Sequence, residues 1–220
     1  MKGKLKIKAV FIGVILCALL TACGTKLDMQ AYLQAMLDLS YKGDSTNYVN
    51  LNLGTAEEAT LVFERGIDSE MSSFQEKLML SQALEEDFRN LFKEIYGKAN
   101  YTVGEAVRES DGSYTVEITY ERMKVFEPMF AIYNEKIAAL PETWAALDET
   151  PSQEEMRENM NEALRDALRE SIEHVEYEEP QTLTIRIALV DNRYTPDSQD
   201  VEALEKALFD SDYSAESVEE

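Results

Sequence analysis

The chain is poor in the residues that build the commonest chemical sites. It has 220 residues, with two cysteines, one histidine and one tryptophan. A single histidine excludes a metal site with two imidazoles, and the sequence contains no G-x-S-x-G, glycine-rich phosphate loop or H-E-x-x-H motif. We therefore expect no catalytic residue, no metal site and no cofactor, and we expect a protein that is not an enzyme.

Basic side chains are also scarce. There are 21 lysines and arginines against 43 acidic residues, a formal net charge of -22. Proteins bind nucleic acid largely by neutralising phosphates with basic side chains, so nucleic acid is excluded as a partner. The acidity does not indicate disorder, because 45% of the residues are hydrophobic and disordered chains combine high charge with few apolar residues.

The N-terminus has the pattern of a bacterial export signal. Four lysines between residues 2 and 8 precede an uncharged, mostly apolar run over 9–22. The 14 residues of this run would rise about 21 Å as a helix, whereas a bilayer core is about 30 Å thick. The run is therefore too short for a stable transmembrane helix and is typical of a signal peptide.

The end of this run resembles the lipobox of bacterial lipoproteins, in which an apolar residue and two small residues precede an acylated cysteine. The four residues are Leu20, Thr21, Ala22 and Cys23. The resemblance implies a lipoprotein signal peptide over 1–22, lipidation of the Cys23 thiol and anchoring of the mature chain by acyl chains. The alternative is an ordinary signal peptide that is followed by a cysteine by chance.

The mature chain is predicted to have three parts. Residues 23–27 form the lipidated N-terminus and a short tether, 28–210 form a single domain, and 211–220 form an acidic tail that we expect to fray. Loss of the signal peptide leaves 17 basic against 43 acidic side chains, a formal charge of -26. We expect repulsion to hold the domain off an anionic membrane within one Debye length, about 8 Å.

Apolar side chains at helical spacing predict seven helical segments. These segments are 29–42, 55–66, 69–80, 84–96, 128–140, 152–175 and 200–209. Asp28 is a predicted N-cap, and Thr55 with Glu58 forms a predicted capping box. Gly66 is predicted to end the second segment, and 43–54 is predicted to be a polar loop.

Between these segments the hydrophobic period changes to two. Alternation over 101–107 and 114–120, on either side of an Asp111-Gly112 turn, predicts a β-hairpin with one buried face. A third strand is predicted over 183–189. This order indicates an α+β fold, a small antiparallel sheet packed against several helices, of which cystatin-like and NTF2-like cones are examples.

With these elements in place, the chain resembles small uncharacterised lipoproteins of Gram-positive bacteria that carry a domain of unknown function. Besides the lipobox, the resemblance lies in residues 31–44, 57–71 and 194–209. It implies an extracytoplasmic domain on the outer face of the cell membrane and offers no catalytic residue. The expected partners are the membrane, through the lipid on Cys23, and an unknown envelope protein or small ligand.

Two acidic patterns have the spacing of a cation site. A ladder of acids at intervals of four ends one turn before His174: Glu154, Glu158, Glu162, Asp166 and Glu170. The ladder could hold calcium or meet a basic partner, and Glu170 with His174 could ligate a divalent ion, but a solvated helix face is the favoured interpretation. Residues 191–202 have the length of a calcium loop, yet Pro196 stands where glycine is required, so only loose contact by Asp197 or Asp200 stays open.

Methionine and tyrosine are frequent, with nine and eleven residues, and could line an apolar groove for a peptide or lipid. Core packing is the favoured interpretation, because four methionines lie on apolar helix stripes: Met29, Met36, Met156 and Met160. Trp144 is expected in a turn between Pro141 and Pro151, where it would plug a gap against the helices.

These features favour a membrane-anchored, extracytoplasmic lipoprotein whose domain binds a ligand or partner without catalysis. The alternatives are an envelope-polymer hydrolase that uses carboxylates and a purely structural envelope component. An exposed pair of carboxylates that converges in a deep cleft, with one of the two in apolar surroundings, would favour the hydrolase. A shallow apolar groove or a broad exposed patch would favour binding, and the absence of any pocket would favour the structural component.

Overall fold

The structure is a computed structural model that describes residues 28–209. The predicted signal peptide, the lipobox with Cys23, the tether and the acidic tail lie outside these residues and stay predictions. The helices are α1 (Met29–Lys42), α2 (Thr46–Asn50), α3 (Ala56–Leu78), α4 (Gln82–Gly97), α5 (Phe126–Ala145), α6 (Gln153–Glu173) and α7 (Ser198–Leu208). The strands are β1 (Asn100–Arg108), β2 (Tyr114–Glu121), β3 (Met123–Lys124), β4 (Glu176–Tyr177), β5 (Gln181–Val190) and β6 (Arg193–Pro196).

The predicted α+β class and the small antiparallel sheet are confirmed. The main sheet has the order β1-β2-β5-β6, and every neighbouring pair is antiparallel. The predicted hairpin forms β1 and β2, and a bulge shifts the register of β1 between Val103 and Ala106. Gly104 fits this bulge because an added Cβ would lie 2.9 Å from the carbonyl oxygen of Glu117.

One face of the sheet is packed against helices. Alternate side chains of β2 and β5 have no exposed surface, namely Val116, Ile118, Ile185 and Ile187. They join an apolar core that also contains residues of α1, α3, α4 and α7, while the intervening side chains are mostly threonine or charged, as the alternation of a half-buried strand requires. Within residues 28–209, every helix is too short or too polar to cross a bilayer.

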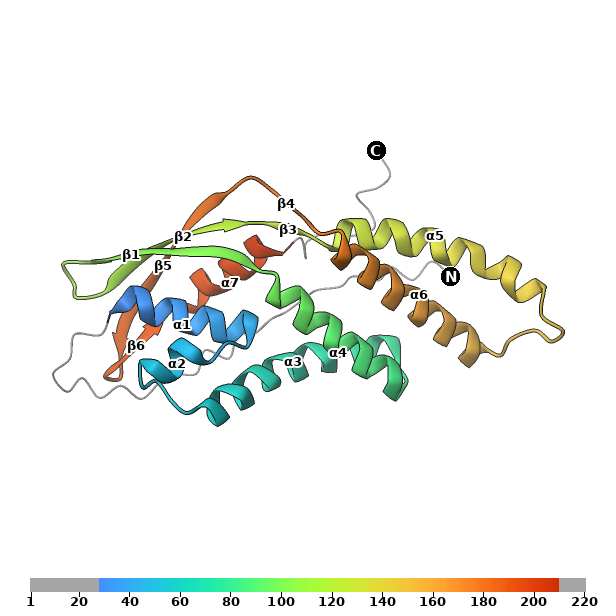
Figure 1. Cartoon of the computed structure of the whole chain (residues 1–220), viewed down its shortest axis with the longest axis horizontal. Helices are drawn as coiled ribbons and strands as arrows, with labels where there is room; N and C mark the ends of the chain where they lie inside the picture. The colour runs from blue at the N-terminus through green and yellow to red at the C-terminus, as the bar shows by residue number, and fades with distance from the viewer. Residues whose placement is uncertain (1–27, 210–220) are drawn as a thin grey trace.

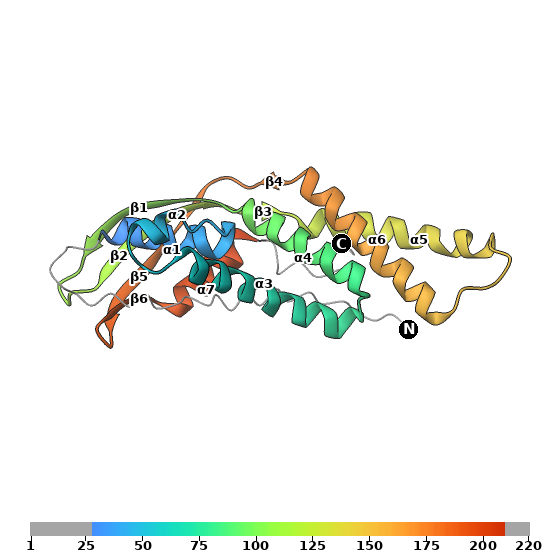
Figure 2. The same ribbon diagram turned by 60° about the horizontal axis from the view of Figure 1, so that its bottom comes forward.

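A helical hairpin extends the molecule beyond the sheet (Figure 1). β2 continues through β3 into α5, and α6 returns through β4 into β5, so that the two-stranded β3-β4 ribbon connects this hairpin to the sheet. We call α5, α6 and their connection, residues 126–173, the arm. Figure 2 shows from a second side that the arm projects along the long axis of the molecule.

Local sequence signals fix several helix ends as predicted. The Asp28 carboxylate accepts a hydrogen bond from the Ala31 backbone N–H at 3.1 Å, and Gly43 ends α1 at φ 64°. The Thr55–Glu58 capping box begins α3. A second capping box, which the sequence analysis did not identify, begins α6 at Ser152.

Three predicted boundaries are wrong. Gly66 is buried inside α3, which runs unbroken to Leu78, because the helix packs continuously on the core and this outweighs the low helix propensity of one glycine. Pro141 lies inside α5, which continues to Ala145, so Trp144 belongs to a helix rather than a turn. The predicted polar loop 43–54 contains α2.

Candidate functional site

Residues 191–202 form ordinary secondary structure. They comprise the β5-β6 turn, β6 and the first turn of α7. The Asp197 carboxylate caps α7 by accepting from the Gln199 backbone N–H at 2.9 Å, and the Asp200 carboxylate accepts from the Arg186 backbone N–H at 2.9 Å. Both carboxylates therefore accept hydrogen bonds from backbone N–H groups. Across residues 28–209, no cluster of three acidic or histidine side chains could hold a metal ion.

The acids of the α6 ladder bind different neighbouring side chains instead of converging on one point. Its contacts are Ser81–Glu158 (2.6 Å), Arg165–Asp166 (2.8 Å) and Lys136–Glu170 (3.2 Å). Glu170 thus pairs with Lys136 of α5, and His174 is an exposed residue at the C-terminal end of α6. Glu158, Glu162 and Asp166 are half-buried, so the ladder is not one uniformly solvated face.

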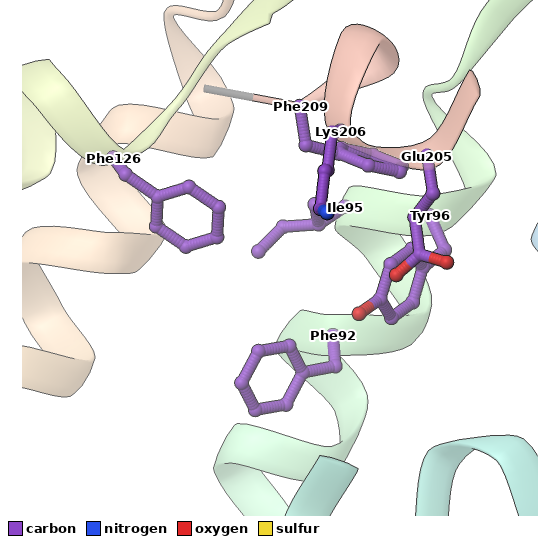
Figure 3. A pocket seen from close by; sticks show the side chains of 7 residues that line it. All are labelled: Phe92, Ile95, Tyr96, Phe126, Glu205, Lys206 and Phe209. Atoms are coloured by element: carbon purple, nitrogen blue, oxygen red, sulfur yellow. The ribbon is translucent and has the colours of Figure 1, made fainter. Parts of the chain in front are cut away.

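A small cavity lies where α4, α7 and the start of α5 meet (Figure 3). The side chains that line it are Phe92, Ile95, Tyr96, Phe126, Glu205, Lys206 and Phe209. Its volume is about 10 Å³, which is close to the minimum for a single water molecule. This cavity is therefore too small for a metabolite or a polymer segment.

A buried acidic side chain lies on α3, and its charge acts on Tyr96, one of the residues that line the cavity. Glu70 is 2% exposed, and its Oε1 atom has no hydrogen-bond partner. Burial raises the pKa of Glu70 to about 7, although the positive charge of Lys77 opposes the rise. Burial, followed by the charges of Glu70 and Glu205, raises the pKa of Tyr96 well above its ordinary value.

Glu70 is not among the predicted site residues, although an acid within an apolar helix stripe is a signal that the sequence contains. Glu70 lies three residues after Ile67 and four before Phe74, which are both buried, so the apolar stripe of α3 includes an acid. A carboxyl in apolar surroundings is one part of the arrangement that would favour a hydrolase, but Glu70 is buried rather than one of an exposed pair in a cleft. It is 2% exposed and does not line the cavity, so no described surface lets a polymer reach it.

A larger but shallow groove lies on β5, β6 and the start of α7. Its volume is about 440 Å³, and it is lined by residues 186, 188, 190 and 195–198. The one basic side chain in the groove, Arg186, pairs with Asp111 of the β1-β2 turn at 2.7 Å. The groove thus lies at the end of the sheet that holds both hairpin turns.

Apart from Glu158, which accepts from Ser81 of the α3-α4 connection, the outer half of the arm packs mainly on its own two helices. α5 packs on α6, and α6 packs on α4. Trp144 is half-buried, and its indole N–H donates to the side chain of Asn159 at 3.0 Å. Leu147 is 53% exposed and Met160 is 39% exposed, so the predicted burial of Met160 is wrong, whereas Met29 is confirmed at 3%.

The arm and the start of α1 lie at opposite ends of the sheet (Figure 1). At the arm end, the register pairs Asn100 with Glu121. At the other end lie the two hairpin turns and the start of α1 (Figure 1), where Tyr32 Oη donates to the Tyr194 carbonyl oxygen of β6 (2.8 Å). Gln30 Nε2 donates farther along the sheet, to the Val103 carbonyl oxygen of β1 (2.9 Å). We call this second end, formed by Asp28 and the hairpin tips 107–113 and 189–193, the tether end.

The fold has a counterpart among solved structures. The chain is similar to ycdA, a protein of Bacillus subtilis that is named as a lipoprotein, with a TM-score of 0.59 and 17% sequence identity. The match covers 83% of this chain and 56% of that protein, so the chain spans little more than half the length of the protein it matches. At this identity the similarity concerns the fold alone. No protein-family model matches the chain, and no curated protein matches its sequence.

Proposed function

We propose that the protein is a lipid-anchored, extracytoplasmic binding protein that holds its arm away from the membrane to meet a basic partner. The observation that carries this proposal is the opposition of the arm and the tether end along the long axis (Figure 1). A chain acylated at Cys23 is joined to the domain through the five residues that end at Asp28. The arm is then the part of the domain farthest from the anchor.

The chemistry of the outer arm favours a cationic protein segment as the partner. Residues 137–160 contain six acidic side chains and one basic side chain, Arg157, a net charge of -5. Leu147 and the half-buried Trp144 add apolar surface, and tryptophan is enriched among the residues that dominate binding energies. A lysine- or arginine-rich segment with apolar side chains would complement both properties.

Other occupants and functions fit these observations less well. A second copy of the arm would bring two surfaces of charge -5 together, and an anionic membrane would repel the arm in the same way. The alternative of an envelope-polymer hydrolase has the buried Glu70 in its favour, but Glu70 is 2% exposed and does not line the cavity of about 10 Å³. A purely structural role gives no reason for the exposed Leu147 at the tip of an acidic arm.

The anchor can be tested in cells that are fed a labelled fatty acid. Replacing Cys23 with Ala removes the thiol that would be acylated, so we expect label on the wild-type protein and none on Cys23→Ala. The variant should also leave the membrane fraction. Cys17→Ala is the matched control and should keep the label. Label that persists on Cys23→Ala would disprove the anchor.

The partner can be tested by photo-cross-linking from position 147 of the arm. The matched control carries the cross-linker at Leu61 of α3, which is 51% exposed. We expect position 147 to capture a segment rich in lysine or arginine, identified from the cross-linked peptide, and Leu61 not to do so. Reversing the charges of Asp148 and Glu149 to lysine should weaken capture by roughly tenfold, or about 1.4 kcal/mol.

Charge reversal elsewhere on the surface is the control for this loss. Glu76→Lys with Glu86→Lys changes the net charge equally on exposed positions of α3 and α4, and capture from position 147 should persist. Equal loss in both double variants would mean that overall charge, not the arm, attracts the partner. Capture of an acidic segment, or of a second copy of this chain, would refute a basic partner.

A further inference from the structure

We propose that the tether end itself contacts the membrane, with the tips of the β1-β2 and β5-β6 hairpins inserting apolar side chains among the phospholipid headgroups. This inference rests on the proposed lipid anchor. It goes beyond that anchor because it assigns a protein surface, residues 107–113 and 189–193, to the lipid. The occupant is the bilayer that holds the acyl chains of Cys23.

The length of the tether places this surface next to the lipid. Five residues lead from Cys23 to Asp28, and five extended residues span at most about 17 Å. Helix α1, which Asp28 caps, begins at the tether end (Figure 1), and Tyr32 in its first turn donates to the carbonyl oxygen of Tyr194 in β6. The hairpin tips therefore lie closer to the membrane than the arm, whose helix α6 alone extends about 31 Å from the sheet.

Both hairpin tips share this end because of the strand register. Arg108 pairs with Tyr114, Tyr114 with Ile187, and Ile187 with Pro196. This row crosses all four strands, and each hairpin turn lies beyond it on the same side. In Figure 1 the two turns reach the end of the molecule opposite α5 and α6.

The tips expose apolar side chains over more than half of their surface. Val107 is 59% exposed, and Leu189 and Val190 are each 52% exposed. Nine large hydrophobic side chains are exposed in the described residues, and these three belong to the two tips. Such side chains lose contact with water when they enter the boundary between headgroups and acyl chains, which is the basis of interfacial binding.

The charge distribution allows this contact while the rest of the domain is repelled. The two tips together contain Arg108 and Arg193 against three acids, a net charge of -1. The outer arm, by contrast, has a net charge of -5 over 137–160. An anionic bilayer therefore repels the arm more strongly than the tips, which favours an upright domain, and the two arginines can approach lipid phosphates.

Fluorescence of single tryptophans can test this arrangement, because the mature chain contains one tryptophan, Trp144, and one cysteine, Cys23. The protein from Cys23 onward is coupled through its thiol to maleimide-phosphatidylethanolamine in vesicles of phosphatidylcholine and phosphatidylglycerol. Trp144→Phe is then combined with either Val107→Trp or Val190→Trp. Vesicles with brominated acyl chains report contact with lipid by quenching the emission.

We expect both tip reporters to shift their emission to shorter wavelength on coupling and to be quenched by brominated lipid. Trp144 of the otherwise unchanged chain should show neither change. Unquenched tip reporters, or quenching of Trp144 as strong as theirs, would overturn the inference. Because coupling supplies the anchor chemically, such a result would leave the lipidation of Cys23 in cells and the partner of the arm untouched.

Discussion

At the scale of single residues, Glu70 is a destabilising side chain in the core, because it is buried and one of its oxygens has no hydrogen-bond partner. A buried carboxyl without a hydrogen-bond partner at one oxygen costs stability when it ionises, because charge is poorly solvated in apolar surroundings. The ordinary pKa of 4.5 is raised to about 7 in the folded chain. The folded state therefore retains its proton over a pH range in which the unfolded chain has lost it.

This difference makes stability depend on pH in a defined direction. Below pH 4.5 both states are protonated at Glu70, and the group contributes nothing to the pH dependence. As the pH rises from 4.5 toward 7, the unfolded chain releases the proton and the folded chain keeps it, so the free energy of unfolding falls. Above the folded-state pKa the full cost is reached, at most about 3 kcal/mol.

Glu70→Gln should remove this cost. We expect the variant to be more stable than the wild type by about 1 to 3 kcal/mol at alkaline pH and to differ little at mildly acidic pH. Urea denaturation at both pH values measures the difference. Glu76→Gln, at an exposed position of the same helix, is the control and should change the free energy of unfolding equally little at both pH values. An equal gain for Glu70→Gln at both pH values would contradict linkage to a proton.

At the scale of secondary-structure elements, the end of α1 shows why a glycine is needed. Gly43 has φ 64°, a conformation that side chains with a Cβ rarely adopt, and an added Cβ would lie 3.0 Å from the ring of Phe63. Gly43→Ala should therefore destabilise the protein by about 1 to 2 kcal/mol.

Gly97 provides the matched control for this substitution. It is the last residue of α4, and an added Cβ would meet nothing within 4 Å. Gly97→Ala should stabilise the protein by about 0.5 to 1 kcal/mol, because alanine restricts the unfolded chain and favours the helix. Urea denaturation of the two variants compares them directly. Loss of stability in Gly97→Ala, or none in Gly43→Ala, would show that the two helix ends do not differ as described.

Elements and boundaries that depend on a local sequence signal could be predicted, whereas those that depend on contacts between distant residues could not. The Thr55–Glu58 capping box and the alternation of β2 are complete within a few residues, so both could be predicted. Gly66 and Pro141 are also local signals, but packing along α3 and α5 carries the helices past them. β6 has four residues and exists through its pairing with β5, which no short pattern in 193–196 reveals.

The two candidate binding surfaces, the arm and the tether end, also depend partly on local sequence signals and partly on distant contacts. The lipobox residue Cys23 and the acidity of 137–160 can be found in the sequence. The arm cannot, because two amphipathic helices with apolar stripes predict burial, and it is their position beyond the β3-β4 ribbon that leaves Met160 partly exposed. Likewise Val107 and Val190 lie far apart in the chain, and the strand register alone places them at one end.

At the scale of the whole molecule, the excess of acid should act on stability as well as orientation. The mature chain is predicted to carry 17 basic and 43 acidic side chains. Favourable pairs exist, such as those of Arg89 with Glu64 and Asp68 and of Lys93 with Glu64. With more than twice as many acids as bases, however, many carboxylates have no basic side chain to pair with, and we expect repulsion in the compact state to outweigh these pairs.

Added sodium chloride should therefore stabilise the mature domain. Salt screens exposed charges over the Debye length, and relief of about 1 kcal/mol would raise the melting temperature by about 2 to 4 °C. Thermal unfolding at increasing salt measures the effect. Calcium chloride at matched ionic strength distinguishes screening from binding: an equal shift indicates screening, whereas a larger shift would reveal a calcium site among the acids of α6 or near Asp197. A melting temperature that falls with salt would mean that the ion pairs of Arg89 and Lys93 outweigh the repulsion.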